Sequence, residues 1–313
     1  MSRLLVPFLV LGEVTFLSAF QPQQDQGKTP SYSAGFYTGR IDSGGGGLGL
    51  QSLVVFPFVG EAYSIALPFA IGYFAHTPDG EVLYANADYA DMFKGLRGAP
   101  DRPGVFRFEL NSMRPSLVPG SAEIEVFGLA VSRRQDKLLV SGQVRSDRRL
   151  TCGLFEVSLP GGATRNVMEI KDCDYRSAWR EPSLSPDGEY AVAVRGGSLE
   201  LFDLKSRKVR SLGNNFVRGS WSPDGDWIAA IRTTGETIVM DTGTFVTRRT
   251  LADTNGDWSP DSRYLLGTTS AGCGNEFVTL QAVDVTTGAR RTITSSVCKI
   301  NSATTAWVNV ERP

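Results

Sequence analysis

The tetrapeptide Ser-Pro-Asp-Gly recurs along the chain at a fixed interval, and this repeat constrains the fold more than any other feature. Copies begin at Ser185 and Ser222, and a variant, Ser-Pro-Asp-Ser, begins at Ser259, so that successive copies lie 37 residues apart. A further copy, Thr-Pro-Asp-Gly, begins at Thr77. Proline presets φ at the second turn position, aspartate bonds to neighbouring backbone, and glycine accepts positive φ. Each copy therefore predicts a turn between two strands.

Each interval between copies holds several short runs with β-like composition. After the copy at Ser185 these runs cover residues 190–194, 199–203, 208–212 and 216–221, and the next interval repeats the pattern. Repeats of about 40 residues that each hold four short strands are typical of a β-propeller blade. The chain is therefore expected to be all-β, built from four-stranded antiparallel blades.

The two ends of the chain supply the pieces of one more blade. A strand-like run ends at Trp307 with nothing after it to complete a blade, whereas residues 34–41, 48–58 and 63–67 have no turn motif of their own. A blade shared between N- and C-terminal strands would close the ring and leave no free edge. First strands then end at six positions, namely residues 76, 131, 184, 221, 258 and 307. The prediction is a six-bladed propeller.

The strongest copies, Trp221-Ser222-Pro223-Asp224-Gly225 and Trp258-Ser259-Pro260-Asp261, resemble the WD40-like repeats of TolB-type six-bladed propellers. Weaker copies at 184–188 and 76–80 are similar, and the second blade departs from the pattern. The resemblance covers roughly residues 30–313 and implies the propeller fold. Propellers of this kind serve as periplasmic scaffolds, as gating domains of serine peptidases and occasionally as lyases, so the resemblance implies no single function.

The N-terminus has the pattern of an export signal. Arg3 precedes the apolar run 4–11, and the small residues Ser18 and Ala19 follow, although Glu13 interrupts the stretch. We expect a signal peptide over residues 1–20, a linker over 21–30 and a single propeller domain over 31–313. A mis-assigned start or a disordered tail is the alternative. The chain offers no uninterrupted span of about 20 apolar residues, so no transmembrane anchor is expected.

The four cysteines also favour export. Cys152 begins one predicted strand and Cys173 follows the next, and Cys273 and Cys298 occupy the same two places further along the chain. The start of a strand lies opposite the end of its antiparallel neighbour, so Cys152–Cys173 and Cys273–Cys298 disulfides are predicted. Four cysteines allow three connectivities, and four separate buried thiols remain the alternative. Disulfides persist in oxidising compartments, which predicts a periplasmic or secreted protein.

Catalytic and cofactor motifs are scarce. The one histidine, His76, stands where other repeats carry Trp221 or Trp258, which favours a packing role over a catalytic base. The glycine run 44–47 lacks the Lys-Ser/Thr of a phosphate loop. Four acidic or amide side chains crowd together without calcium-loop spacing, namely Asp253, Asn255, Asp257 and Asp261. We expect no catalytic residues, no metal and no cofactor.

A row of polar residues on the first strands is the candidate binding site. First strands are innermost in a propeller, so equivalent positions should encircle the central channel. Mostly small residues lie two places before each turn, namely Ala75, Ala130, Ser183, Ser220, Asp257 and Ala306. Two places further back lie Tyr73, Gly128, Glu181, Arg218, Asn255 and Thr304. We define Tyr73, Glu181, Arg218, Asn255 and Thr304 as the channel ring, and a plain inter-blade ion pair between Glu181 and Arg218 is the alternative.

Three functions remain open at this point. The leading hypothesis is an exported, non-enzymatic, monomeric scaffold that binds a protein or peptide of the cell envelope through its channel mouth. The second is a small-molecule enzyme of the lyase or lactonase kind acting at the same mouth, and the third is a structural module without a ligand. Formal net charge is −1 with both signs mixed, so nucleic acid is not an expected partner.

Overall fold

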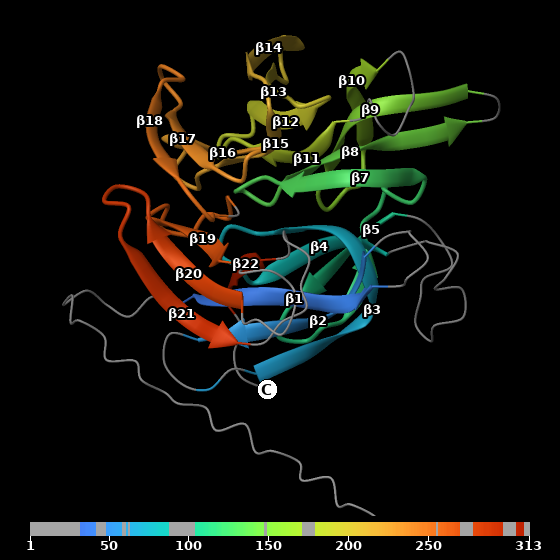
Figure 1. Cartoon of the computed structure of the whole chain (residues 1–313). Helices are drawn as coiled ribbons and strands as arrows, with labels where there is room; N and C mark the ends of the chain where they lie inside the picture. The colour runs from blue at the N-terminus through green and yellow to red at the C-terminus, as the bar shows by residue number, and fades with distance from the viewer. Residues whose placement is uncertain are drawn as a thin grey trace, which may run out of the picture.

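The computed structural model describes residues 32–41, 48–57, 61, 63–87, 104–146, 149–170, 179–254, 256–269, 278–296 and 305–309. These stretches form strands and turns that are arranged as six blades around a central axis (Figure 1). The predicted signal peptide, the linker, three of the cysteines (Cys173, Cys273, Cys298) and two ring residues (Asn255, Thr304) lie outside them.

Blades 2, 3 and 4 are complete four-stranded antiparallel sheets. Blade 2 contains β7 (Ile124–Val131), β8 (Lys137–Ser146), β9 (Arg149–Ser158) and β10 (Thr164–Ile170). Blade 3 contains β11 (Arg180–Leu184), β12 (Tyr190–Arg195), β13 (Ser198–Asp203) and β14 (Lys208–Gly213). Blade 4 contains β15 (Phe216–Trp221), β16 (Trp227–Arg232), β17 (Thr237–Asp241) and β18 (Thr247–Leu251). The strands run from the innermost to the outermost in chain order, as the repeat predicts.

The ring closes through a blade shared by the two ends of the chain. Strand β1 (Ser33–Ile41) pairs with β22 (Thr305–Val308), with Ser33 opposite Val308. Strands β2 (Leu48–Phe56) and the first part of β3 (Tyr63–His76) complete this closing blade. The blue strands β1–β3 and the red strand β22 accordingly share the lower part of Figure 1. The predicted closure is confirmed.

Strand β3 belongs to two blades. Its first part pairs with β2, and its last part pairs with β4 (Val82–Ala87), which begins blade 1 together with β5 (Val105–Glu109) and β6 (Pro115–Leu117). Blade 5 contains β19 (Tyr264–Thr269), β20 (Val278–Asp284) and β21 (Arg290–Ser296). Its innermost position is held by a single bridge between Trp258 and Leu265.

The Ser-Pro-Asp-Gly turns are held by their own side chains. In blade 3 the hydroxyl of Ser185 donates to Asp187 Oδ1 at 2.5 Å. Asp187 Oδ1 also accepts a hydrogen bond from the backbone N–H of Glu189 at 2.9 Å. Gly188 closes the turn with φ of 71°. Asp224 and Asp261 make the same two bonds in their blades. The repeated aspartates therefore stabilise turns, as expected from local turn chemistry.

The core lies between the faces of neighbouring blades. Val192 and Leu199 of blade 3 pack with Ile228 and Ala230 of blade 4 in one cluster of fully buried side chains. Burying a side chain of this kind contributes about 1.5–3 kcal/mol, so each blade is stabilised chiefly by its neighbours. An isolated blade would expose both of its apolar faces.

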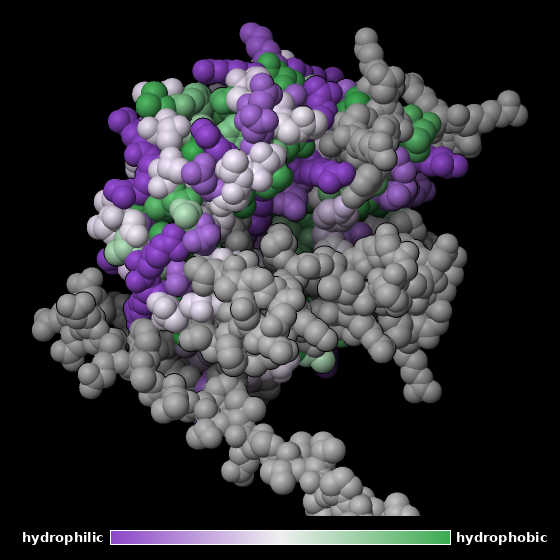
Figure 2. Space-filling model, in the orientation of Figure 1, coloured by the Kyte–Doolittle hydropathy of each residue, from purple (hydrophilic) through white to green (hydrophobic). Residues whose placement is uncertain are grey.

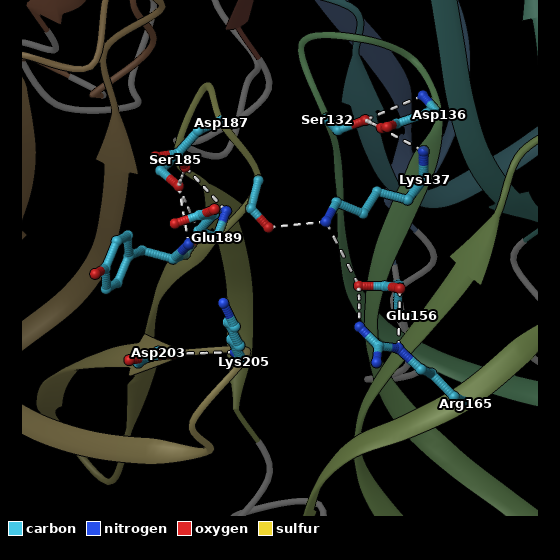
Figure 3. A network of polar contacts seen from close by, with 12 residues as sticks. Ser132, Asp136, Lys137, Glu156, Arg165, Ser185, Asp187, Glu189, Asp203 and Lys205 are labelled. Atoms are coloured by element: carbon cyan, nitrogen blue, oxygen red, sulfur yellow. Dashed lines mark hydrogen bonds and ion pairs between the residues drawn. The ribbon is translucent and has the colours of Figure 1, made fainter.

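A polar bridge supplements this packing between blades 2 and 3. Figure 3 shows Lys137 of β8 between the two blades, with Glu156 and Arg165 on its own side. Lys137 Nζ donates to the carbonyl of Gly188 at 2.8 Å and lies 3.6 Å from Glu156 Oε2. A blade 2 side chain thus contacts the turn of blade 3 directly.

Few large apolar side chains of the described residues are exposed. On the face seen in Figure 2, hydrophobic residues of the described stretches appear singly or in small groups among hydrophilic ones. Exposed large hydrophobic residues in these stretches include Val209, Val217 and Val246. Among the described residues, no helix is long and apolar enough to cross a membrane.

Candidate functional site: the central channel

A cavity of about 590 Å³ runs along the propeller axis. Its wall comes from the inner strands and the turns that follow them, including Tyr73, Gly128, Glu181, Arg218 and Asp257. Ligand pockets are typically about 300–1,000 Å³, so the cavity could hold a small molecule or a short peptide segment. Of the predicted channel ring, Tyr73, Glu181 and Arg218 line this cavity, whereas Asn255 and Thr304 lie outside the described residues.

A β-bulge interrupts the inner strand of four blades at the level of the ring. The register with the neighbouring strand shifts in β3, β7, β11 and β15. In each strand the extra residue lies at or beside the aligned ring position, namely Tyr73, Gly128, Glu181 and Arg218. A bulge bends its strand and changes the direction of a side chain. The bulges therefore determine how the ring side chains enter the channel.

Glu181 has the most unusual backbone of these positions. Its φ is 46°, in the left-handed region that costs a non-glycine residue about 1–3 kcal/mol and persists only when the surroundings enforce it. Gly128 of blade 2 permits this conformation, because a Cβ there would lie 2.7 Å from the Glu181 nitrogen. Close packing of blades 2 and 3 therefore holds Glu181 in place.

Side chains of four successive blades form a continuous polar belt at this level. Arg218 Nε lies 3.0 Å from Glu181 Oε2, and Arg218 Nη2 lies 2.8 Å from Asp257 Oδ1. The Thr305 hydroxyl then donates to Asp257 Oδ2 from the closing blade. We name Glu181, Arg218, Asp257 and Thr305 the channel belt. The ion pair considered as the alternative for Glu181 and Arg218 is present.

The belt carries two carboxylates against one guanidinium. Burial alone would lower the pKa of Arg218, but Asp257 and Glu181 outweigh it and raise that pKa, so the guanidinium stays charged. The Asp257 side chain is 11% exposed, whereas that of Glu181 is 42% exposed. The more exposed carboxylate of Glu181 is therefore accessible from the channel, whereas the buried carboxylate of Asp257 is occupied by Arg218 and Thr305.

At the level of the belt, the wall supplied by blade 1 is neutral. Tyr73 of blade 1 lines the cavity, and its backbone N–H donates to Asn86 Oδ1 at 2.6 Å. The channel therefore has an acidic side, made by blades 3 to 5, and a neutral side with an aromatic ring.

Asp257 and Thr305 belong to the site although the ring prediction omitted them. Aligning the repeats within the chain places Asp257 in the row of mostly small residues, where it is the charged member. This charge at a channel-facing position is the sequence signal that could have identified Asp257 as part of the site. Thr305 carried no such signal, because it directly follows the aligned position 304 and faces Asp257 only through strand pairing in the closing blade.

A second layer of large side chains lies between the belt and the turns. The indole N–H of Trp258 donates to the Ser220 carbonyl at 3.2 Å, and that of Trp307 donates to the Asp257 carbonyl at 3.1 Å. Each indole thus binds the backbone of the preceding blade just before its turn. His76 occupies the equivalent position in blade 1, where burial lowers its pKa to about 3. A histidine with such a pKa is a poor general base near neutral pH, which agrees with the packing role expected from the repeat.

The acidic residues near blade 5 have separate partners. Asp253 lies 3.8 Å from Arg290, Asp257 contacts Arg218, and Asp261 holds its own turn. Within the described stretches, no group of three or more His, Cys, Asp or Glu side chains is placed to hold a metal ion.

Cys152 is the one cysteine that the described residues include. It is buried in β9 and lies opposite Ile170, the last residue of β10. The strand arrangement behind the Cys152–Cys173 prediction is therefore present. The pairings themselves, and the Cys273–Cys298 pair entirely, stay predictions because the other cysteines fall outside the described residues.

Comparison with known proteins finds similarity at the level of fold. No protein-family profile and no curated protein sequence matches the chain. The crystal structure of TolB from Acinetobacter baumannii superposes with a TM-score of 0.62 at 16% identity, covering 89% of this chain and 67% of that one. A putative TolB from Agrobacterium tumefaciens gives 0.52 at 17% identity, covering 84% and 88%. A nidogen/laminin complex gives 0.54 at 12% identity, covering 88% and 98%.

Proposed function

We propose, from the premise that the chain folds as a TolB-type six-bladed propeller, that it is an exported scaffold which binds a protein or peptide of the cell envelope. The binding site in this proposal is the channel mouth formed by the ring, Tyr73, Glu181, Arg218, Asn255 and Thr304, together with Asp257. The protein acts as a monomer in the periplasm or outside the cell, without catalysing a reaction.

The observation that carries the proposal is the presentation of Glu181. Its strained backbone, the glycine that permits it and its shared guanidinium hold a half-exposed carboxylate at a cavity of about 590 Å³. Strained residues concentrate at sites where the geometry has a use. A preorganised acceptor opposite an aromatic side chain suits a polar group of a peptide, such as a backbone N–H or a basic side chain.

An enzyme of the lyase or lactonase kind is the second candidate, because the cavity has the size of a small-molecule site. It would need a base near neutral pH, and the low pKa of His76 disfavours that residue. A bound metal ion after purification, or turnover of a sugar acid or lactone, would favour this candidate over the scaffold.

The test is a pull-down from envelope extract that compares Glu181→Gln with a matched control. Glu109→Gln makes the same chemical change in an exposed ion pair, in which Arg107 Nη1 lies 2.9 Å from Glu109 Oε1, away from the channel. We expect wild type and Glu109→Gln to capture the same envelope protein and Glu181→Gln to lose it, with all three melting alike. Equal capture by Glu181→Gln, or capture of nothing by wild type, would contradict the proposal.

A further inference from the structure

The second residue of each turn lines the other end of the channel. Inner strands run from the belt to the turns, so Glu181 lies near the start of β11 and Pro186 lies in the turn after its end. The described residues at this turn position that line the cavity are Pro78, Arg133, Pro186, Pro223 and Pro260. We name these five residues the turn collar.

Arg133 is the exception in the collar. Blade 2 carries Ser132-Arg133-Arg134-Gln135 where blades 1, 3, 4 and 5 carry Ser/Thr-Pro-Asp, so an exposed guanidinium replaces a proline ring. Arg133 Nη1 donates to the carbonyl of Pro223 at 2.7 Å. Pro223 belongs to blade 4, so the side chain reaches across the mouth from a blade two positions away.

The guanidinium of Arg133 has a neutral partner only. Among the described residues, no carboxylate lies within ion-pair distance of it, whereas Arg107, Arg165, Arg195 and Arg263 each pair with an acidic side chain. A carboxylate can bind a guanidinium through two parallel N–H···O bonds, whereas the single Pro223 carbonyl accepts from only one nitrogen of Arg133. A carboxylate ligand can therefore compete with the Pro223 carbonyl for this guanidinium.

The surroundings limit the kind of anion. The four collar prolines are apolar, and Trp221 and Trp258 line the cavity behind them. One guanidinium in an apolar collar balances a single negative charge, so a monoanion fits better than a phosphate dianion. The cavity continues for the length of the inner strands, which leaves room for an apolar body several atoms long behind the charged group.

We propose that the turn collar binds the C-terminal carboxylate of a peptide, with Arg133 as the anion-binding residue and the prolines and tryptophans contacting the terminal apolar side chain. This site lies at the end of the channel opposite the ring, and it does not depend on what the ring binds. The repeat departs from its consensus in blade 2 because this turn supplies the charge.

The test measures binding of a defined probe by calorimetry. The probes are N-acetyl-Leu-Phe with a free C-terminal carboxylate and the same dipeptide as its C-terminal amide. Only the acid offers Arg133 a charged acceptor that can bind through two oxygens, so we expect the acid to bind wild-type protein about tenfold more tightly than the amide. This comparison needs no variant, so it cannot be confused with a folding defect.

Two variants then locate the site. Arg133→Met keeps an unbranched apolar side chain and leaves no charge unpaired, and it should reduce the acid-to-amide ratio to about one. Arg134→Met removes the neighbouring exposed arginine of the same turn, which does not line the cavity, and it should bind both probes as wild type does. The proposal would be overturned if wild type bound the acid and the amide equally, or if it bound neither of them. An unchanged acid-to-amide ratio in Arg133→Met would overturn it too.

Discussion

Arg218 of blade 4 lies 3.0 Å from Glu181 of blade 3 and 2.8 Å from Asp257 of blade 5, so one guanidinium joins three consecutive blades. The two carboxylates differ in exposure, at 42% for Glu181 and 11% for Asp257. Removing a partner from a buried pair leaves an uncompensated charge, whereas exposed pairs contribute little. Loss of the buried Arg218–Asp257 contact should therefore lower the stability more than loss of the exposed Arg218–Glu181 contact.

The first prediction follows from this inequality. Arg218→Met leaves Asp257 without its cation in a buried position and should lower the free energy of unfolding by roughly 3 kcal/mol. Glu181→Gln should cost less than about 1 kcal/mol, because water solvates what remains. Urea unfolding of both variants measures the difference. An equal loss of unfolding free energy in the two variants would show that the contact of Arg218 with Asp257 does not contribute more to stability than its contact with Glu181.

Charge reversal gives a second prediction about the same residues. Exchanging the pair as Glu181→Arg with Arg218→Glu restores the contact between blades 3 and 4 but places a carboxylate against Asp257. We expect the double variant to stay at least as unstable as Arg218→Met. Adding Asp257→Asn should then recover part of the lost stability in the same unfolding measurement. Full recovery by the double variant alone would contradict the belt.

The third prediction concerns ring closure. Strand β22 is buried along its whole length, and Trp307 contacts the ring of Tyr32 edge-on at 5.1 Å. Deleting residues 303–313 would expose the edge of β1 and the apolar interior of the closing blade. We expect aggregation or a broad thermal transition. A truncated protein that melts as sharply and at the same temperature as the full chain would refute the shared blade.

Acid should destabilise the protein through His76. Its pKa is lowered to about 3 in the folded chain by burial, from about 6.5 when unfolded. Between these values the unfolded state binds the proton and the folded state does not, so stability is lost as pH falls below 6.5. Blade 3 carries Leu184 at the equivalent position, so His76→Leu is a conservative replacement. Between pH 7 and pH 5, the free energy of unfolding of this variant should fall by up to about 2 kcal/mol less than that of wild type. Parallel pH dependence in the two proteins would exclude a buried neutral His76.

The disulfides give a prediction that tests export. Cys152–Cys173 and Cys273–Cys298 would each close a loop of about 20 residues and stabilise the protein by roughly 2–4 kcal/mol. Peptide mapping of material secreted into an oxidising compartment should recover both linked peptides. Recovery of four free thiols would remove this support for export, and recovery of crossed pairs would refute the predicted connectivity.

The architecture was predictable because its signal is local. Each Ser-Pro-Asp-Gly turn is stabilised by bonds within five residues, such as Ser185 to Asp187 and Tyr190 to Ser185, so the spacing of the motif alone positions the strands. The closing blade followed from counting strands. The bridge at Trp258 in place of a full inner strand was not predicted, because its motif resembles those of the regular blades.

The site was predictable only in outline, since it depends on interactions between blades. The bulge at Glu181 requires Gly128 in another blade, and the reach of Arg133 to Pro223 spans 90 residues of sequence. No periodic pattern encodes such contacts. Aligning the repeats within the chain therefore predicted channel-facing positions, of which Tyr73, Glu181 and Arg218 line the cavity, but it did not predict the contact of Asp257 with Arg218 or the charge in the turn collar.

The most direct test of the proposed function is site-specific photo-crosslinking in the cell envelope. A benzophenone amino acid at position 73 replaces one aromatic side chain of the channel wall by another, and the same residue at Val209, which is 44% exposed on β14, reports on the outer rim. The account predicts a discrete crosslinked envelope protein from position 73 and none from position 209. Absence of a crosslink at 73, or the same product from both positions, would contradict binding at the channel mouth.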